Sequence, residues 1–425
     1  MANIYPFKGF RYDKASVNDI SRVVTQPYDK ITRKLKKEYL LRHPANIVRI
    51  IRNSDYLEAA SLWHRWIDNG TLVRDRKSSL YIYRQNYKIG SEEMTRTGFI
   101  GMVSLDDENL AVKGHETILE KPLEDRLKMI RATEANEGLI FALYSDEELQ
   151  TDRILDSITG ALNPEIDVVD DFDVRNRIWC LNDERKISEV TDLLKGKPLY
   201  IADGHHRFQT SVLYNRECVE KGWRPGADES FNKRMIAVFN MESPGLRILA
   251  THRAVRNLPE PDFEGILEKA GRYFDIAQVE NLQQIEGKLA EKDFCFGLAA
   301  GKKPSFYLLA LKEGILDDPG FMPDTTGKIR DLDVTILHEG MLDTVLGIGR
   351  DKVASGEYVN YFRSSVELID SIKDGTNQLG FLVRPTTIGE VREVSEAGEK
   401  MPQKSTDFFP KLLTGLVLMK MEIEK

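Results

Sequence analysis

The segment from residue 199 to 213, LYIADGHHRFQTSVL, constrains the fold of this chain more than any other stretch. The apolar run at 199–202 is typical of a buried strand, and Gly204 permits a tight turn directly after it. Further on, Phe208, Val212 and Leu213 would supply the buried face of a helix. This order predicts a strand–turn–helix unit with the polar residues 203–207 at its junction.

The junction contains residue types that can hold an anion. The start of a helix presents unpaired N–H groups and the positive end of the helix dipole, and the guanidinium of Arg207 matches the geometry of phosphate oxygens. His205 and His206 can share that role. We therefore expect bound phosphate here, with Asp203, His205 and His206 as catalytic residues. Gly204 and Arg207 are the expected phosphate contacts.

Two other interpretations of DGHHR stay open. Asp203 can simply cap the helix while the histidines satisfy nearby backbone groups. A protein-bound zinc ion is the second interpretation, but adjacent histidines on a helix do not easily face one ion, and the HExxH spacing does not occur. We therefore expect no metal ion held by these side chains alone.

Length and composition limit the class of protein. With 425 residues the chain is too long for one ordinary core, which suggests two or three packed units. Hydrophobic residues make up 41% and charged residues 30%, the balance of a folded soluble protein. The three cysteines lie far apart, so they support neither a disulfide framework nor a zinc site.

Charge and hydropathy exclude some kinds of partner. The formal net charge of −8 gives no reason to expect binding to a nucleic-acid backbone or an anionic membrane. The first residues lack a signal-peptide pattern, and no run approaches the roughly 20 apolar residues that span a bilayer. We therefore expect a cytoplasmic protein that binds small molecules, with no nucleic-acid or membrane partner.

Alternating helical and strand patterns along the chain predict an α+β (mixed α/β) fold. Helical signals occur at 29–44, 54–70, 122–136, 334–346, 364–375 and 387–398. Hairpins are expected at 79–89 with 96–105, 234–241 with 246–255, and 293–300 with 305–312. Soft boundaries near 120 and 255 give an N-terminal mixed region (1–119), a core with DGHHR (120–255) and a C-terminal α+β region (256–425).

Four longer motifs resemble one protein family over nearly the whole chain. They are QPYDKI, GHETILEKPLEDRLKMIRATEAN, YIADGHHR and MPQKSTDFFPKLLTGL, and they identify the chain as a member of the bacterial and archaeal family called domain of unknown function 1015. IADGHHR and the helix after it also resemble the phosphate-binding motif of the ParB-like free serine kinases, which phosphorylate L-serine. This resemblance implies a ParB-like strand–turn–helix core elaborated by further helices and hairpins. It also implies that the family contains serine kinases, some of which resemble enzymes that use pyrophosphate as donor.

Phosphoryl transfer needs cations around the phosphate, usually Mg²⁺, and a base for the nucleophile. Glu116 in the GHET loop is the expected base or metal ligand, and His115 beside it is a substrate-binding candidate. Arg126 is the expected second anion clamp, and Asn136, near the end of the same helix, is a further substrate-binding candidate. Asp29 in QPYDKI is an alternative base.

Each of these charged residues also has an ordinary structural interpretation. Glu116 can be an exposed loop carboxylate, and Arg126 can form a surface pair with Asp125. Asp29 can cap the helix that follows it.

The C-terminal motif contains a polar loop, KMPQKSTDFFPK, that can close on a phosphate. Lys404, Ser405, Thr406 and Lys411 are its expected phosphate-binding residues. Lysines in such a loop are more often only solvated, but hydroxyls beside Lys404 and two nearby prolines favour a site.

These features predict a Mg²⁺-dependent kinase that transfers a phosphoryl group to the hydroxyl of free L-serine. No GxxxxGK[ST] loop occurs to explain adenosine recognition, a difficulty that pyrophosphate as donor would remove. A ParB-like nucleotide-binding regulator without catalysis and a metal-dependent phosphohydrolase are the alternatives. Among the remaining histidines only His252 is kept, as a weak candidate.

Overall fold

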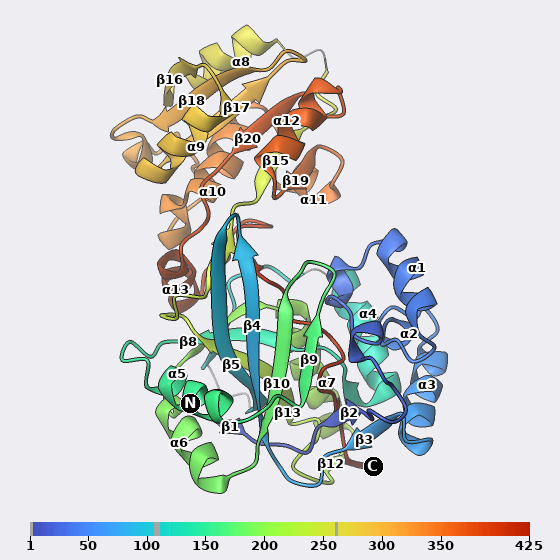
Figure 1. The fold of residues 1–425 in the computed structure, drawn as a ribbon. Helices are drawn as coiled ribbons and strands as arrows, with labels where there is room; N and C mark the ends of the chain where they lie inside the picture. The colour runs from blue at the N-terminus through green and yellow to red at the C-terminus, as the bar shows by residue number, and fades with distance from the viewer. Residues whose placement is uncertain (1–2, 106–110, 119, 260–261) are drawn as a thin grey trace. The chain divides into compact units, whose positions relative to one another are not determined.

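A computed structural model describes residues 3–105, 111–118, 120–259 and 262–425. The chain forms two compact units, each described by itself (Figure 1). Unit 1 comprises residues 1–114, 118–247 and 410–425, and unit 2 comprises residues 115–117 and 248–409.

The two expected boundaries, near residues 120 and 255, differ in how close they lie to the observed division between the units. The boundary near residue 255 falls close to the observed division after Arg247. The boundary near residue 120, which adjoins residues outside the described ranges, falls inside unit 1. Strands from both sides of it, β5 (Glu92–Ser104) and β13 (Lys233–Asn240), pair in one sheet. Residues 410–425 also return to unit 1, which no local sequence signal indicates.

A nine-stranded mixed sheet forms the centre of unit 1. Its strands follow the order β6-β11-β8-β13-β5-β4-β10-β9, with β1 paired to β5. The expected hairpin at 79–105 is confirmed as β4 and β5, with Tyr83 opposite Gly98. The remaining strand bounds are β1 (Ile4–Tyr5), β4 (Leu80–Ile89), β6 (Val112–Lys113), β8 (Ile140–Tyr144), β9 (Ile166–Val169), β10 (Arg175–Leu181) and β11 (Leu199–Asp203).

Helices pack around this sheet in unit 1. They are α1 (Arg33–Arg42), α2 (Val48–Ile51), α3 (Tyr56–Asp68), α4 (Glu120–Thr133), α5 (Gln150–Ala161), α6 (Glu184–Leu194) and α7 (His205–Glu220). One apolar core joins the sheet to α5 and α6 and includes Leu155 and Val190. Helix α4 packs between α3 and α7. The helix of the GHETILEKPLEDRLKMIRATEAN motif therefore lies beside the helix that begins in DGHHR.

Short two-stranded ladders attach the C-terminal segment to unit 1. β22 (Met419–Lys420) pairs with β7 (Ala135–Asn136), and β23 (Ile423–Glu424) pairs with β12 (Arg224–Pro225). A further ladder joins β2 (Phe10–Tyr12) to β3 (Leu72–Arg74). The pairings of β22 and β23 hold the end of the described chain in unit 1, and Lys411 of the same segment lies beside Asp203.

Unit 2 is built on a six-stranded sheet in the order β16-β18-β17-β20-β15-β19. Its strands are β15 (His252–Val255), β16 (Phe274–Val279), β17 (Cys295–Ala300), β18 (Ser305–Leu311), β19 (Val359–Phe362) and β20 (Leu379–Leu382). Its main helices are α8 (Phe263–Ala270), α9 (Leu282–Glu291), the π-helix η5 (Ile336–Val345), α11 (Arg350–Ser355), α12 (Ser365–Lys373) and α13 (Ile388–Glu396). Short elements complete it, namely β14 (Arg247–Leu249), β21 (Asp407–Phe409) and α10 (Asp333–Thr335).

The hairpin expected at 234–255 is wrong, whereas the one at 293–312 is confirmed. β17 and β18 pair along their whole length. β13 stays in the sheet of unit 1, between β8 and β5, and β15 joins β19 and β20 in unit 2. The SPG turn at 243–245 therefore leads from one unit to the next, because each strand finds its buried partners among distant segments.

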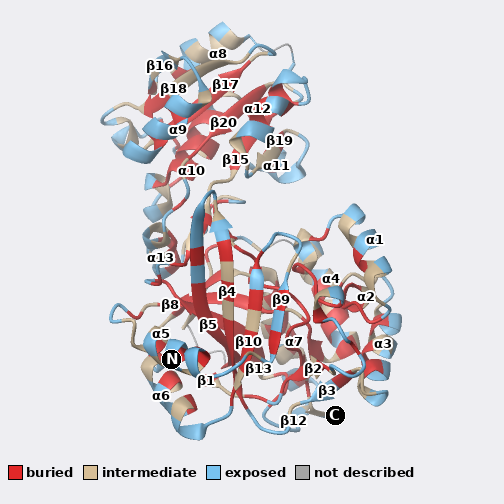
Figure 2. Ribbon diagram, viewed as in Figure 1, coloured by how far each residue is buried: buried red, intermediate tan, exposed pale blue. Residues whose placement is uncertain are grey.

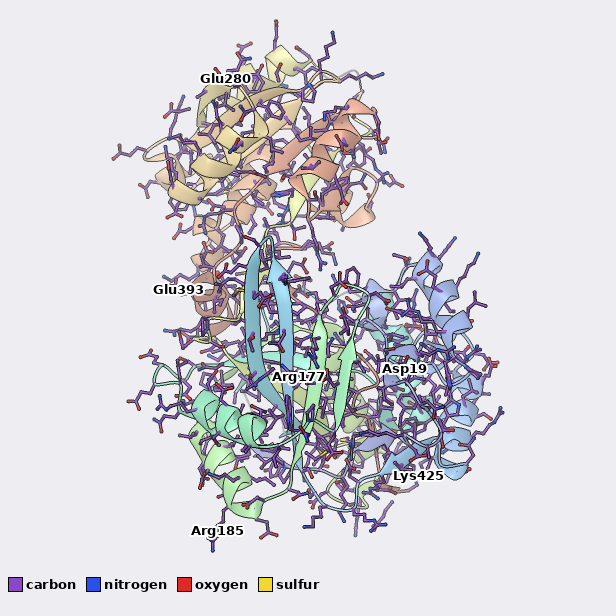
Figure 3. The ribbon with its side chains drawn as sticks, in the orientation of Figure 1. Asp19, Arg177, Arg185, Glu280, Glu393 and Lys425 are labelled. Atoms are coloured by element: carbon purple, nitrogen blue, oxygen red, sulfur yellow. The ribbon has the colours of Figure 1, made fainter. Side chains whose placement is uncertain are left out.

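Burial follows the layers in each unit. The central strands are largely buried, while helices such as α6 and α9 present an exposed outer face (Figure 2). Figure 3 shows charged side chains such as Arg185 and Glu280 on the outside of their units. Helices together with a mixed sheet in unit 1 and an antiparallel sheet in unit 2 confirm the expected α+β class. Within the described ranges, no helix is both long enough and apolar enough to cross a membrane.

Candidate functional site

The strand–turn–helix unit expected at 199–213 is present in unit 1. Strand β11 ends at Asp203, and helix α7 begins at His205. The expected buried face of this helix is wrong, because Phe208, Val212 and Leu213 are only half-buried, whereas the face that contains Ser211 and Tyr214 is buried. Gly204 joins them with a φ of +95°, a left-handed conformation that glycine adopts without steric penalty. The register of the pairing between β11 and β8 shifts between Ile201 and Asp203, so the backbone at Asp203 departs from regular strand geometry.

Asp203 does not cap helix α7. The N-cap position is Gly204, which has no side chain to offer a capping bond. Asp203 instead accepts a hydrogen bond from Arg207 Nη2 at 2.6 Å. The capping interpretation is therefore wrong, because an ion pair across the turn uses the carboxylate.

Cations surround the carboxylate of Asp203. Lys411 Nζ lies 3.5 Å from Asp203 Oδ1. Burial alone would raise the pKa of Asp203, but the positive charges of Lys411, Arg207 and Lys30 outweigh burial and hold that pKa well below its ordinary value. Asp203 is therefore ionised at neutral pH, and positive charge from three separate segments converges on it.

The two histidines of the motif take different positions. His205 is buried against Gly114, where an added Cβ would lie 2.8 Å from the imidazole Cδ2. His206 is half-buried, and its backbone carbonyl accepts a hydrogen bond from Thr210 Oγ1 at 2.7 Å. His206 is thus the more accessible of the two histidines at the start of α7.

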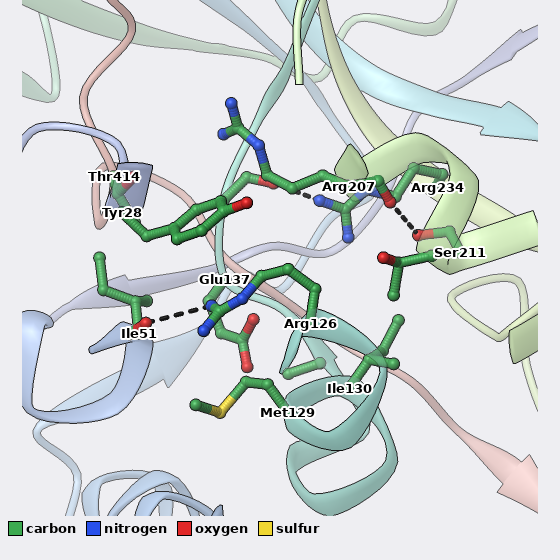
Figure 4. A pocket seen from close by; sticks show the side chains of 13 residues that line it. Tyr28, Ile51, Arg126, Met129, Ile130, Glu137, Arg207, Ser211, Arg234 and Thr414 are labelled. Atoms are coloured by element: carbon green, nitrogen blue, oxygen red, sulfur yellow. Dashed lines mark hydrogen bonds between the residues drawn. The ribbon is translucent and has the colours of Figure 1, made fainter. Parts of the chain in front are cut away.

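Arg207 connects this corner to a pocket. Its Nη1 donates to the Leu139 carbonyl at 2.6 Å, and its side chain also borders an open pocket with about 450 Å³ of empty volume, including open solvent (Figure 4). The pocket is lined by Tyr28, Ile51, Arg126, Met129, Ile130, Ala135, Glu137, Gly138, Arg207, Thr210, Ser211, Arg234 and Thr414. Arg207, although itself buried, therefore belongs both to the corner and to the lining of the pocket.

Arg126 lines the same pocket as Arg207. The Tyr28 ring centroid lies 4.3 Å from Arg126 Cζ and 5.9 Å from Arg207 Cζ, so one aromatic ring contacts both cations. Arg126 also pairs with Asp125 at 2.6 Å and donates to the Ile51 carbonyl at 3.1 Å. The fold thus brings together two arginines that the sequence suggested separately as anion clamps.

Two charged residues that line the pocket, Arg234 and Glu137, were not predicted from the sequence. Arg234 is the second residue of β13, and burial together with the charge of Arg207 lowers its pKa to about 9. Burial raises the pKa of Glu137. Glu137 directly follows the motif that ends at Asn136, which was the one available signal. Arg234 merely precedes an apolar run and carries no signal of its own.

Asp29 and Asn136 differ in their relation to the pocket. Asp29 is exposed in the 3₁₀ helix η2 (Tyr28–Lys30), next to the pocket residue Tyr28. It does not cap α1, because Thr32 does so. Asn136 is fully buried, and its Oδ1 accepts the Met235 N–H at 3.0 Å. The side chain of Asn136 therefore fixes β13 and does not line the pocket.

A protein-family model supports the family membership that the long motifs indicated. The family model described as protein of unknown function (DUF1015) matches residues 4–335, a stretch that contains both QPYDKI and DGHHR. The chain belongs to the DUF1015 family. No curated protein sequence matches it significantly.

Solved structures similar to this DUF1015 chain include a free serine kinase mutant in complex with AMP. That structure has 13% identity and a TM-score of 0.38, covering 73% of this chain and 87% of its own. A conserved hypothetical protein from Pyrococcus furiosus has 13% identity and a TM-score of 0.35, covering 72% of this chain and 89% of its own. C-terminally truncated SbnI from Staphylococcus aureus has 13% identity and a TM-score of 0.36, covering 74% of this chain and 85% of its own.

The other predicted site residues of the DUF1015 chain belong to unit 2. Within that unit, His115 Nε2 lies 2.9 Å from Thr406 Oγ1, and the His115 carbonyl accepts the Met401 N–H at 2.8 Å. Burial lowers the pKa of Lys400, and the negative charge of Glu116 opposes that shift. The GHET loop and the C-terminal loop therefore meet, although nearly 300 residues separate them in sequence.

Neighbouring residues of the C-terminal loop are held by internal bonds. Ser405 Oγ donates to the Pro402 carbonyl at 2.6 Å. Lys404 is exposed with a φ of +59°, and its carbonyl accepts a bond from Arg253 Nη2 at 3.1 Å. The predicted phosphate loop is thus divided: Lys404, Ser405 and Thr406 lie in unit 2, and Lys411 lies beside Asp203 in unit 1.

Proposed function

We propose that this protein is a phosphotransferase that moves a phosphoryl group to the hydroxyl of free L-serine and forms O-phosphoserine. The observation that carries the proposal is the position of Arg207, which bonds to Asp203 at the start of α7 and also borders the pocket. A donor phosphate at the corner and a small acceptor in the pocket would then share one guanidinium group.

The corner has the properties that a phosphate cradle requires. Helix α7 is 16 residues long, so the positive end of its dipole favours an anion at Gly204. An added Cβ at Gly204 would lie 3.1 Å from Arg207 Nε, so glycine keeps the backbone open at this point. Lys411 and Lys30 add charge that can neutralise the transferred group.

The proposed step forms a bond between the serine hydroxyl oxygen and the donor phosphorus. The bond from that phosphorus to the bridging oxygen breaks, and its electron pair leaves with the departing phosphate. The hydroxyl proton passes to a carboxylate and then to solvent. Asp29 is the preferred base, because it is exposed and adjoins Tyr28 of the pocket.

Pyrophosphate is the preferred donor, with a nucleotide as alternative, because the chain contains no GxxxxGK[ST] loop. Among the described residues, no three His, Cys, Asp or Glu side chains gather into a metal site. The carboxylate of Asp203 at the corner is already surrounded by cations. These residues do not form a protein-only Mg²⁺ site, so in our proposal Mg²⁺ would arrive on the phosphate oxygens of the donor.

The test incubates the full-length protein and Mg²⁺ with L-serine and, separately, pyrophosphate, ATP or ADP. O-Phosphoserine is then measured by mass spectrometry. We expect product with at least one donor, at least tenfold less from Lys411→Ala, and no change from Lys186→Ala, which alters an exposed lysine on α6. The absence of phosphoserine with every donor would refute the proposal. Saturable nucleotide binding without turnover would then indicate a regulator, and phosphate release without serine would indicate a phosphohydrolase.

A further inference from the structure

The pocket beside Arg207 mixes charges of both signs. Its charged lining residues are Glu137 and three arginines, Arg126, Arg207 and Arg234. Arg126 and Arg207 each pair with an aspartate outside the pocket lining. Arg234, only 4% exposed, has no ion pair among the described residues, and its Nη2 donates to the Gly138 carbonyl. The charge of Arg234 is therefore the one that a ligand could balance.

Two guanidinium donors in this pocket lack an acceptor. Nε of Arg207 and Nε of Arg234 are both buried and have no hydrogen-bond partner in the described part of the chain. A buried donor without an acceptor is energetically unfavourable. Because both side chains line the pocket, a ligand with two acceptor oxygens, such as a carboxylate, would remove that cost.

Glu137 changes the kind of anion that the pocket favours. Its Oε1 accepts a hydrogen bond from Thr133 Oγ1 at 2.6 Å, which fixes the carboxylate in place. A second phosphate or a polyphosphate would be repelled by this group, because like charges at short range in a buried site are unfavourable. A ligand that carries an ammonium beside its carboxylate would pair with Glu137 as well as with the arginines.

The other residues that line the pocket are suited to a small uncharged side chain of a ligand. Ile51, Met129, Ile130 and Ala135 form the apolar part of the pocket. Tyr28, Ser211 and Thr414 supply hydroxyl groups at its border (Figure 4). A short side chain with one hydroxyl therefore has both apolar and hydrogen-bonding neighbours here.

We infer that this pocket binds the charged end of a small α-amino acid, with Arg234 and Arg207 on its carboxylate and Glu137 on its ammonium. The inference rests on the proposed function in taking that amino acid as the phosphoryl acceptor. It adds that two residues outside the DGHHR motif, Arg234 and Glu137, recognise the charges of the acceptor together with Arg207.

Equilibrium binding to the full-length protein tests the inference without requiring turnover. Isothermal titration calorimetry compares L-serine with ethanolamine, which lacks the carboxylate, and with 3-hydroxypropionate, which lacks the ammonium. We expect saturable binding of L-serine and at least tenfold weaker binding of each analogue. The inference is overturned if L-serine does not bind, or if either analogue binds as tightly as L-serine.

Matched variants connect the binding to the pocket. Glu137→Gln should weaken L-serine binding at least tenfold without weakening 3-hydroxypropionate binding, because the lost contact is the one to the ammonium and the lost charge is one that repels an anion. Arg234→Lys should weaken both of these ligands. The control is Glu229→Gln, which alters a buried glutamate of unit 1 that pairs with Arg74, and should leave L-serine affinity unchanged. Circular dichroism verifies that each variant is folded.

The outcomes separate this inference from the proposed function. Normal L-serine binding by folded Glu137→Gln and Arg234→Lys variants would overturn the inference, even if the enzyme makes O-phosphoserine. Selective loss of L-serine binding in these variants would support it, even if no donor yields product.

Discussion

Asp203, the last residue of β11, accepts a 2.6 Å hydrogen bond from Arg207 across the turn at Gly204. Nη1 of the same guanidinium donates to the carbonyl of Leu139, just before β8. Arg207 thus joins two neighbouring strand ends to the first turn of α7. A planar group with several donors can do this, whereas a single ammonium cannot.

Arg207→Lys should therefore lose both structure and activity. One ammonium cannot bond to Asp203 and the Leu139 carbonyl in the same geometry, so a buried acceptor is left unsatisfied at a cost of about 1–3 kcal/mol. Urea denaturation should show this loss, and O-phosphoserine formation should fall by at least a hundredfold. The control is Arg175→Lys, which alters an exposed pair with Asp167 and should change stability by less than about 1 kcal/mol. Equal effects of the two substitutions would contradict the role of Arg207.

Gly204→Ala should impair activity more than stability. Alanine at a φ of +95° carries a conformational cost of about 1–2 kcal/mol, and its Cβ would lie 3.1 Å from Arg207 Nε, so the guanidinium must shift. Gly222→Ala isolates the conformational cost, because Gly222 has a φ of +74° and nothing within 4 Å of its Cβ position. Thermal melts should show comparable losses for both variants, while only Gly204→Ala should reduce phosphoserine formation. Full activity of Gly204→Ala would argue against a phosphate at this turn.

Lys411→Met should destabilise unit 1 most at neutral pH. The charge of Lys411 helps to hold the pKa of Asp203 below its unfolded value, so ionised Asp203 contributes stability above that unfolded value. This contribution disappears as the pH falls through the folded-state pKa. The difference in urea stability between wild type and Lys411→Met should therefore be largest near pH 7 and shrink below pH 4. A difference that is independent of pH would contradict the electrostatic role of Lys411.

Unit 2 should lose stability in mild acid because two buried histidines accept hydrogen bonds. His252 Nδ1 accepts the Val383 N–H at 3.3 Å, and His338 Nε2 accepts a bond from Arg253 Nε at 3.2 Å. Burial and the charge of Arg253 lower the pKa of His252 to about 4, and the same causes lower that of His338.

A folded-state pKa below the unfolded value of 6.5 gives stability that is complete above pH 6.5 and is lost as the pH falls toward 4. For His252 the loss amounts to about 3 kcal/mol. The melting temperature of His252→Gln should accordingly depend less on pH between 7 and 4 than that of wild type. His64→Gln, which alters an exposed histidine of α3, should keep the wild-type dependence.

The sequence by itself determined the local units of this protein. An apolar run, a glycine and a helical pattern within residues 199–213 were sufficient to predict the β11–α7 corner, since strand, turn and helix propensities act over a few residues, but they did not predict which face of α7 is buried. The β4–β5 and β17–β18 hairpins followed for the same reason, because a short turn joins adjacent partners.

Tertiary structure decided everything that depends on pairing distant segments. β13 pairs with β8 and β5 and not with residues 246–255, which were its expected partner. That choice placed Arg234 in a pocket with Glu137, which lies 97 positions earlier in the chain. Lys411 reached Asp203 from 208 positions away. Such contacts depend on which buried surfaces of the whole chain fit together, and no local pattern of residues encodes that fit.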